Sequence, residues 1–221
     1  MNGATILFTE MSPDLDWEDD FNHWYDSHHI PVRAAVPGFL SAQRYCDPER
    51  PNYLAVYEIA SPEVLESVAY QKVRAQPNAQ TAWMLSNVQN YSRYVGQRLN
   101  ETRRDDVDDG FLDAPYLYAV FFSVPDERAA EFNAWYDDEH VPLLLKCKHW
   151  LAVRRFEITE GEPQPWTHLA IHYIDDMEAF TSPEREAARA TEWRSKLAEE
   201  PWFQSSAQLY ERIGDRFKGG A

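Results

Sequence analysis

The sequence reads Phe21-Asn22-His23-Trp24-Tyr25-Asp26-Ser27-His28-His29-Ile30-Pro31, and 111 positions later it reads Phe132-Asn133-Ala134-Trp135-Tyr136-Asp137-Asp138-Glu139-His140-Val141-Pro142. Seven of these eleven positions are identical, among them the tryptophan, the tyrosine and the last histidine. Agreement of this kind between two tryptophan-bearing segments indicates an internal tandem repeat. A period of about half the chain favours two similar domains over a solenoid of short units.

Around the motif, each copy has the same order of predicted elements. β-rich runs at 5–9 and 116–122 predict a strand, followed by the motif helix, which is expected to stop at its proline. Further strands are predicted at 39–45 and 53–59 in the first copy, and at 150–156 and 168–174 in the second. Helical segments at about 62–85 and 177–197 precede a last strand at about 90–95 and 207–213.

This β-α-β-β-α-β order is that of the ferredoxin-like fold, so the predicted class is α+β with two ferredoxin-like repeats. We expect the repeats at 1–100 and 114–221, joined by a charged linker at 101–113. A four-stranded antiparallel sheet with helices on one face leaves its other face open. We therefore expect the two sheets to pack on each other as an intramolecular pseudo-dimer of the dimeric α/β-barrel type.

Composition narrows the class of partner. A hydrophobic content of 44% predicts a packed core, and a formal net charge of −16 argues against nucleic acid or an anionic membrane surface. No apolar run approaches the ~20 residues that span a bilayer, and no leader peptide is recognisable. The two cysteines, Cys46 and Cys147, stand at non-equivalent places, so neither a disulfide framework nor a zinc site is indicated and a cytoplasmic location is expected.

Both copies of the motif resemble the first-helix signature of the dimeric α/β-barrel superfamily, and the EthD-like branch is the most similar. The residues that carry the resemblance are Trp24-Tyr25-Asp26, His29 and Pro31, and in the second copy Trp135-Tyr136-Asp137-Asp138-Glu139-His140 and Pro142. The resemblance implies a pocket between sheet and helices. It does not fix a reaction, because the superfamily includes cofactor-independent monooxygenases, isomerases, polyketide cyclases and, more remotely, haem-binding members.

The motif places a carboxylate and a tyrosine beside a histidine. His140 follows Tyr136 by four residues and Asp137 by three, which are neighbouring positions on a helix surface. A carboxylate in this position fixes the tautomer of the imidazole and raises its pKa, which suits a general acid or base. These three residues are therefore the catalytic candidates of the second copy. The corresponding residues of the first copy are His29, Asp26 and Tyr25.

Each candidate also has a structural interpretation. The two histidines can bond the last carbonyls of the helix before the proline, and the two aspartates can cap or face solvent. Trp135 is favoured as a core residue, although it is also a candidate substrate contact. Glu139 and its counterpart His28 fall in the apolar arc of the helix, where a charge must be paired, line a cavity or reach water at the helix end.

Three further substrate contacts are predicted outside the motif. His168 and His172 point to the same face of their strand, which either lines the pocket or lies at a sheet–sheet seam. Arg155, repeated as Arg44, can clamp a substrate carboxylate or form an ordinary salt bridge. Glutamate and these histidines are acceptable metal ligands, but no helical His pair supports a metal site, and none is predicted.

The sequence favours a cofactor-independent enzyme that acts by proton transfer on a small, apolar, aromatic or polyketide-like molecule. Isomerase, cyclase and lyase chemistry all fit, with no cofactor. The alternatives are a non-catalytic protein that holds a small ligand for a partner enzyme, and an oxygen-dependent monooxygenase with or without haem. Two copies of the chain can associate further as a homodimer.

Overall fold

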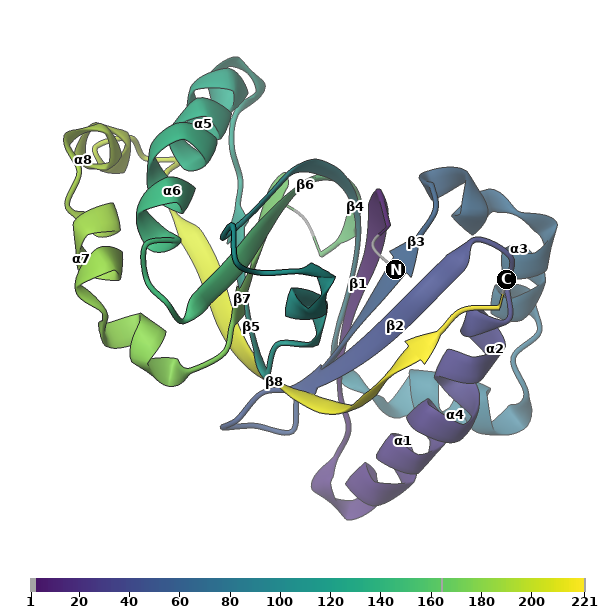
Figure 1. The fold of residues 1–221 in the computed structure, drawn as a ribbon. Helices are drawn as coiled ribbons and strands as arrows, with labels where there is room; N and C mark the ends of the chain where they lie inside the picture. Colours follow the sequence, from purple (N-terminus) through teal and green to yellow (C-terminus); the bar gives the residue numbers. More distant parts are fainter. Residues whose placement is uncertain (1–2, 164, 221) are drawn as a thin grey trace. The chain divides into compact units, whose positions relative to one another are not determined.

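The structure is a computed structural model that describes residues 3–163 and 165–220. Contacts divide the chain into two compact units. The first unit comprises residues 3–97, 159–163 and 213–220, and the second comprises residues 98–158 and 165–212. Each unit holds one copy of the repeated motif (Figure 1).

The first unit is built on an antiparallel sheet. β3 pairs with both β1 and β2, and β1 pairs with β4, which gives the order β2-β3-β1-β4. The strands are β1 (Thr5–Ser12), β2 (Phe39–Cys46), β3 (Tyr53–Ile59) and β4 (Gln89–Arg103). The helices are α1 (Glu18–Trp24), α2 (Ile30–Ala34), α3 (Val68–Ala75) and α4 (Ala79–Asn87), with short 3-10 turns η1 (Leu15–Trp17) and η3 (Pro62–Glu66).

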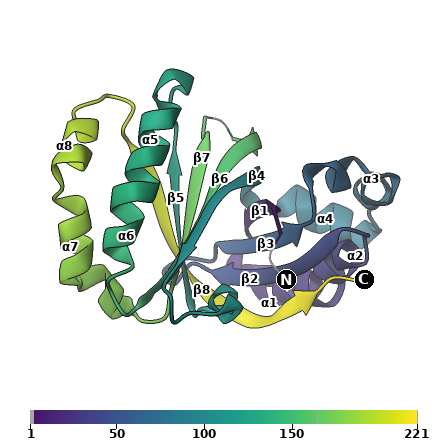
Figure 2. The same cartoon turned by 45° about the horizontal axis from the view of Figure 1, so that its top comes forward.

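The second unit repeats this arrangement, with the sheet order β6-β7-β5-β8. Its helices lie on one side of its strands in both ribbon views (Figures 1 and 2). The strands are β5 (Tyr116–Phe122), β6 (Trp150–Glu162), β7 (His168–Ile174) and β8 (Ser205–Lys218). The helices are α5 (Ala129–Trp135), α6 (Val141–Leu144), α7 (Pro183–Arg189) and α8 (Glu192–Ala198), with 3-10 turns η4 (Asp109–Asp113), η5 (Asp126–Arg128) and η7 (Met177–Thr181).

The motif helix does not stop at its proline, which corrects the sequence prediction. In the first unit, the π-helical segment η2 (Tyr25–His29) connects α1 to α2, and Pro31 lies in the first turn of α2. The amide of Ile30 donates to the carbonyl of Tyr25, five residues earlier. Proline has no amide N–H to donate, and in a regular α-helix its ring clashes with the carbonyl one turn earlier. The wider π turn before Pro31 relieves this clash.

The second copy has the same device, in η6 (Tyr136–His140), where the amide of Val141 donates to the carbonyl of Tyr136. The extra residue in the turn brings the motif histidine over the aromatic residues before it. The ring centroids of Trp135 and His140 lie 4.8 Å apart, and those of Tyr136 and His140 lie 5.1 Å apart. The π turn therefore fixes where the candidate catalytic histidine stands.

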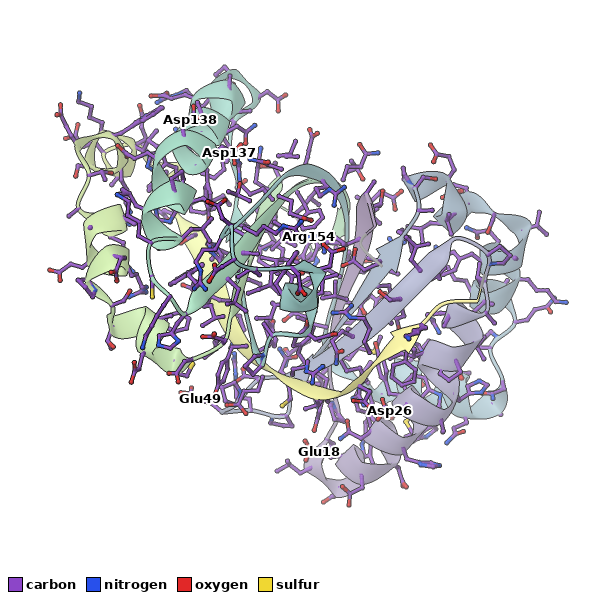
Figure 3. All side chains as sticks on the ribbon, viewed as in Figure 1. Glu18, Asp26, Glu49, Asp137, Asp138 and Arg154 are labelled. Atoms are coloured by element: carbon purple, nitrogen blue, oxygen red, sulfur yellow. The ribbon has the colours of Figure 1, made fainter. Side chains whose placement is uncertain are left out.

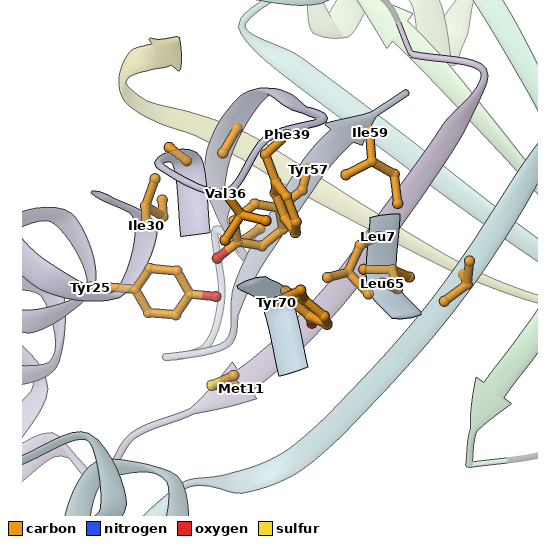
Figure 4. Packing of buried hydrophobic residues seen from close by; sticks show 14 of the residues in the cluster. Leu7, Met11, Tyr25, Ile30, Val36, Phe39, Tyr57, Ile59, Leu65 and Tyr70 are labelled. Atoms are coloured by element: carbon orange, nitrogen blue, oxygen red, sulfur yellow. The ribbon is translucent and has the colours of Figure 1, made fainter. Parts of the chain in front are cut away.

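The aromatic face of the motif helix forms the core, as predicted from its spacing. Phe21 and Trp24 are fully buried in the first unit, and Phe132 and Trp135 are buried in the second. In the first unit they share one cluster with residues of the sheet and of the later helices, part of which is seen in Figure 4. Burial of each such aromatic side chain contributes on the order of 2–3 kcal/mol, so the motif anchors the helix to its sheet.

The predicted α+β class is confirmed, and β3, β5 and β7 have the predicted bounds. β4, β6 and β8 are longer than predicted, because their second halves carry charged residues in no regular alternation and the hydrogen bonds of a neighbouring strand are not visible in the sequence. The stretch predicted as a linker therefore begins inside β4. No helix in the described part of the chain is long and apolar enough to cross a membrane.

Candidate functional site

The second unit has a cavity of about 130 Å³, partly open to solvent, between the π turn, the sheet and the two later helices. Its inner wall is made by aromatic side chains and the two histidines that the sequence singled out, and its rim carries three arginines. The residues on which the chemistry depends are Tyr136, His140, Trp150, His172, Arg189 and Arg194.

A hydrogen-bond chain fixes the protonation of the inner wall. The indole nitrogen of Trp150 donates to Nδ1 of His172 over 3.1 Å, and Nε2 of His172 lies 3.0 Å from the hydroxyl of Tyr136. An indole N–H can only donate, so Nδ1 carries no proton and the proton of the neutral ring is on Nε2. His172 is thus a neutral imidazole that donates to Tyr136.

Burial supports the same assignment, because His172 is 1% exposed. Loss of hydration holds the pKa of His172 well below its ordinary value, and the nearby His140 and Arg155 lower it further. The hydroxyl oxygen of Tyr136 accepts the bond from His172, so its own proton remains available to a molecule in the cavity. Burial also raises the pKa of Tyr136, which keeps that proton in place at neutral pH.

His140 has the opposite arrangement. Its Nδ1 lies 3.2 Å from the carbonyl oxygen of Ala188 in α7. A carbonyl can only accept, so Nδ1 carries the proton and Nε2 has a free lone pair on a side chain that lines the cavity. Burial lowers the pKa of His140 to about 4, so the neutral form prevails at pH 7. The cavity thus presents one hydrogen-bond donor, Tyr136, and one proton acceptor, His140.

Asp137 does not orient His140, which corrects the role expected from their spacing. No hydrogen bond or ion pair joins the two among the described residues, and the carbonyl of Ala188 fixes the tautomer instead. Asp137 pairs with Arg155 over 2.8 Å. The guanidinium of Arg155 also bonds Asn133 and lies 4.6 Å from the ring centroid of Tyr136.

Arg155 therefore holds the motif helix onto β6 and is not among the residues that line the cavity. The first unit has the same arrangement, because Arg44 bonds Asp26 over 2.9 Å and Asn22 over 2.6 Å. Both arginines are 2% exposed. The salt bridge is thus a repeated clamp on a buried arginine, and each aspartate belongs to its own motif helix (Figure 3).

Two other predicted contacts stand outside the cavity of the second unit. Glu139 is half-buried on the π turn and does not line it. His168 packs its ring against Phe132 and bonds the hydroxyl of Thr167 over 2.9 Å. Burial lowers the pKa of His168 to about 4. His172, in contrast, lines the cavity and bonds Tyr136 of the motif, so its side chain is on the helix-facing side of its sheet.

The first unit has its own cavity of about 230 Å³, lined in part by His29 and Tyr57. Tyr57 stands where the second copy has His172, so the hydrogen-bond chain is missing. His29 is 2% exposed, and its Nδ1 has no hydrogen-bond partner among the described residues. Burial lowers its pKa well below the ordinary value. His28 bonds Asn78 over 3.1 Å, and Tyr25 packs on His29.

Sequence reasoning missed the residues that give the second cavity its character. The sequence pattern places Trp150 only in a strand and does not single out the arginines of α7 and α8. The signal was present as a difference between the copies: Trp150 replaces Phe39 and His172 replaces Tyr57. In the described part of the chain, no three His, Cys, Asp or Glu side chains converge as metal ligands do.

Solved structures share this fold across nearly the whole chain. A structure described as an anthrone oxidase-like protein has a TM-score of 0.73 at 12% identity, covering 98% of this chain and 93% of its own. A proposed monooxygenase from Fusobacterium nucleatum has a TM-score of 0.62 at 11% identity, with coverage of 100% and 98%. A variant of chlorite dismutase from Candidatus Nitrospira defluvii reaches 0.62 at 10% identity, with coverage of 97% and 92%.

By sequence, a domain family of unknown function, DUF4286, matches residues 115–210, which is most of the second copy. No curated protein matches the chain. The likenesses to solved structures show that the chain shares their fold over nearly its whole length. At these identities they concern the fold alone.

Proposed function

We propose that the second unit is a cofactor-independent acid–base enzyme that removes a proton from a small, one-ring aromatic molecule. The observation that supports this most directly is that two side chains lining the same cavity have complementary hydrogen-bonding roles, one as a proton acceptor and the other as a proton donor. His140 offers a lone pair on Nε2 and Tyr136 offers a proton, and each state is enforced by a neighbour that can act in only one way. A base and an oxyanion donor are the two groups that enolisation needs.

In this mechanism, Nε2 of His140 accepts the proton from a carbon next to a carbonyl. The electron pair of the C–H bond moves to the carbonyl oxygen, where the Tyr136 hydroxyl stabilises the developing negative charge. Burial makes His140 a weak base in the empty cavity, and the enolate beside it then favours the imidazolium. Return of the proton to another atom gives an isomer, and attack of the enolate within the molecule gives a cyclised product.

The size of the cavity favours a single ring. An apolar cavity of ~150 Å³ engineered in another protein holds one benzene molecule, whereas drug-sized ligands occupy about 300–1,000 Å³. The cavity here has a volume of about 130 Å³ and is partly open to solvent. It matches one ring, so within the predicted substrate class we favour a one-ring molecule with a side chain that reaches the rim.

Hydrogen–deuterium exchange tests this function directly. Phenylpyruvate and phenylacetone both have an acidic CH2 group between a ring and a carbonyl, and NMR in D2O follows its exchange. We expect exchange above the solvent rate with the wild-type protein, loss of that acceleration in His140→Gln and its retention in the matched variant His29→Gln. Equal rates in wild type and His140→Gln, or no acceleration with either probe, would overturn the proposal.

Oxygen-dependent monooxygenation is the second candidate, and the descriptions of the similar solved structures favour it. The same proton removal would precede it. The carbanion of a CH2 group adds O2 and a proton to give a hydroperoxide, which loses water to leave a ketone, so one O2 is consumed and one water is released. Oxygen uptake that depends on His140 would distinguish this outcome from isomerisation.

The residues of the cavity do not fit a haem. Of the described imidazole nitrogens that line it, Nε2 of His140 is the one left free for iron. That ring packs against Trp135 and Tyr136, in a cavity of about 130 Å³ that is small for a macrocycle. A protein that only holds the ligand for a partner enzyme remains the non-catalytic alternative, and turnover distinguishes it.

The organisation of the chain is part of the same proposal. We propose that residues 1–100 and 114–221 arose by tandem duplication of an EthD-like domain and act as an intramolecular pseudo-dimer. The identical order of elements and the two π turns support this. A cytoplasmic location and a homodimer of the whole chain stay predictions, which fractionation and light scattering would test.

A further inference from the structure

Three arginines stand on the rim of the second cavity. Arg185 and Arg189 come from α7, and Arg194 comes from α8. Arg185 and Arg194 are half-buried, and Arg189 is exposed. All three line the cavity whose inner wall holds Tyr136 and His140, so a molecule that enters the cavity passes within their reach.

None of the three is paired with a carboxylate among the described residues, although the chain has 37 acidic and 21 basic residues. Arg185 donates to the carbonyl of Phe180 over 3.0 Å, and Arg194 donates to the carbonyl of Arg189 over 3.3 Å. Each of these guanidiniums also stands over an aromatic ring. These contacts hold the side chains in place, satisfy one N–H each and leave the positive charges unneutralised.

The stability of the two helices does not explain these positions. Ser182 and Thr191 cap α7 and α8 by accepting from the amides of Arg185 and Arg194, so both arginines stand in the first turn of a helix. A cation in the first turn opposes the helix dipole and is less favourable there than an acidic residue. A residue that costs local stability and faces a cavity is a candidate for function.

The first unit has fewer charges at the same places. Aligned by their caps, Ser67 and Asn78, its helices carry Tyr70, Arg74 and Thr81 where the second unit has Arg185, Arg189 and Arg194. One of the three arginines is thus shared. The cavity of the first unit is lined by Arg33 and Arg93 besides Arg74, and Arg93 is paired with Glu160. Arg185 and Arg194 are therefore particular to the second unit, which also has the Trp150–His172–Tyr136 chain.

We propose that the rim formed by Arg185, Arg189 and Arg194 is an anion site, and that the substrate is a small aromatic carboxylate whose ring enters the cavity while its carboxylate stays at the rim. This inference rests on the proposed function for the identity of the substrate, but the anion site can be tested without turnover. Guanidinium groups bind carboxylates through two parallel N–H donors, so the rim orients the molecule as well as attracting it. The carbon beside the ring is thereby held at His140.

The state of Arg194 supports the assignment. Its pKa is lowered by loss of hydration and by the charge of Arg189. Two like charges that repel each other in a partly desolvated place are stabilised by an anion between them. The negative charge of the chain as a whole makes such a local positive site selective, because other surfaces repel the same ligand.

A matched pair of ligands tests the anion site by calorimetry. Phenylacetate and phenylacetamide have the same ring and nearly the same shape, and only the first is charged. We expect phenylacetate to bind wild type at least about tenfold more tightly, with an affinity that falls as salt is added. Arg189→Gln and Arg194→Gln should each weaken phenylacetate binding by about tenfold and leave phenylacetamide binding unchanged.

Arg74→Gln is the control, because it removes an exposed arginine from the corresponding place in the first unit, and it should change neither affinity. Equal binding of the two ligands, or full phenylacetate affinity in Arg189→Gln and Arg194→Gln, would overturn the proposal. Loss of phenylacetate binding in Arg74→Gln alone would also overturn it, since the anion would then bind to the first unit.

The anion site and the acid–base function fail in different ways. Phenylacetate binding that needs the arginines, together with unaccelerated exchange of phenylpyruvate, would keep the anion site and remove the proposed enzyme. His140-dependent exchange at equal efficiency on phenylpyruvate and on phenylacetone, which has a methyl group in place of the carboxylate, would keep the enzyme and remove the anion site. If both inferences hold, kcat/KM for phenylpyruvate exceeds that for phenylacetone, and Arg194→Gln removes the difference.

Discussion

The tautomer of His172 is the feature of the site on which most of its chemistry depends, and Trp150→Phe tests it. Phenylalanine keeps an aromatic ring in a position that is 1% exposed but removes the N–H that donates to Nδ1 of His172. Without that donor, the proton of His172 can occupy either nitrogen. When it occupies Nδ1, the Tyr136 hydroxyl donates to Nε2 of His172 and is lost to the substrate.

The cost to stability has two parts. Replacing an indole by a phenyl ring removes about three heavy atoms, and a residual cavity on the order of 40 Å³ costs about 1 kcal/mol at about 24 cal/mol per Å³. A buried imidazole nitrogen left without a partner costs about 1–3 kcal/mol more. We therefore expect the free energy of unfolding to fall by about 2–4 kcal/mol in a urea titration.

A matched control separates the two parts. The indole nitrogen of Trp202 has no hydrogen-bond partner among the described residues, so Trp202→Phe removes the same volume without removing a hydrogen bond. It should cost about 1 kcal/mol or less. Because Trp202 is half-buried and Trp150 is 1% exposed, the difference between the two variants gives an upper limit for the bond to His172.

The chemical assay is nitrogen-15 NMR of the histidine side chains together with hydrogen–deuterium exchange of phenylpyruvate. Wild type should show His172 as a single Nε2–H tautomer, and Trp150→Phe should show both tautomers. Loss of one oxyanion donor lowers a rate by about 100-fold or more, so exchange should fall by that order. A single, unchanged tautomer in Trp150→Phe, with exchange retained, would refute the account of Tyr136 as the donor.

Three other predictions follow from the same contacts. Burial lowers the pKa of His140 from 6.5 to about 4, so between these pH values the unfolded chain binds more protons than the folded chain. The free energy of unfolding should therefore fall by about 1–3 kcal/mol as the pH drops from 6.5 to 4. Calorimetry of His140→Gln should show a flatter pH–stability curve in this range. Asp137→Asn leaves the buried Arg155 without its ion-pair partner and should lower the melting temperature by the equivalent of about 3 kcal/mol, whereas a mere loss of catalysis at an unchanged melting temperature would restore the orienting role. Phe39→Trp combined with Tyr57→His should build the donor chain in the first unit, seen as a new single-tautomer histidine by NMR, and two tautomers would show that the surroundings matter beyond these two positions.

Most of the fold can be predicted from the sequence because the same pattern of elements occurs in both copies. Each copy's alternation of β-rich runs and helical segments is confirmed by the other, and runs with a uniform apolar character, such as 53–59, 116–122 and 168–174, have the predicted bounds. The ends of β4, β6 and β8 were not predictable, because a strand that pairs with a sequence-distant neighbour needs no pattern of its own.

The candidate site was readable only in part. His140 and Tyr136 were named because they recur, but the assumption of 100° per residue failed at the π turn. The predicted contact between Asp137 and His140 is therefore wrong. The spacing of side chains cannot show that a backbone carbonyl, that of Ala188, orients His140 in place of a carboxylate. Trp150 escaped notice since a tryptophan at the start of a strand is most often a core residue.

The residues that recur in the two copies and the residues that distinguish the candidate site are largely different sets. What the two copies share, such as the arginine–aspartate clamp of Arg44 and Arg155, is buried structure that holds the motif helix. What distinguishes the candidate site of the second unit lies at positions where they differ, namely Trp150, His172, Arg185 and Arg194. The motif histidine belongs to both groups. In the first unit it is a buried ring whose Nδ1 has no hydrogen-bond partner among the described residues, and in the second it is an oriented base. Recurrence in a duplicated chain therefore identifies the scaffold first, and a functional site is better sought where a recurring residue meets neighbours that do not recur.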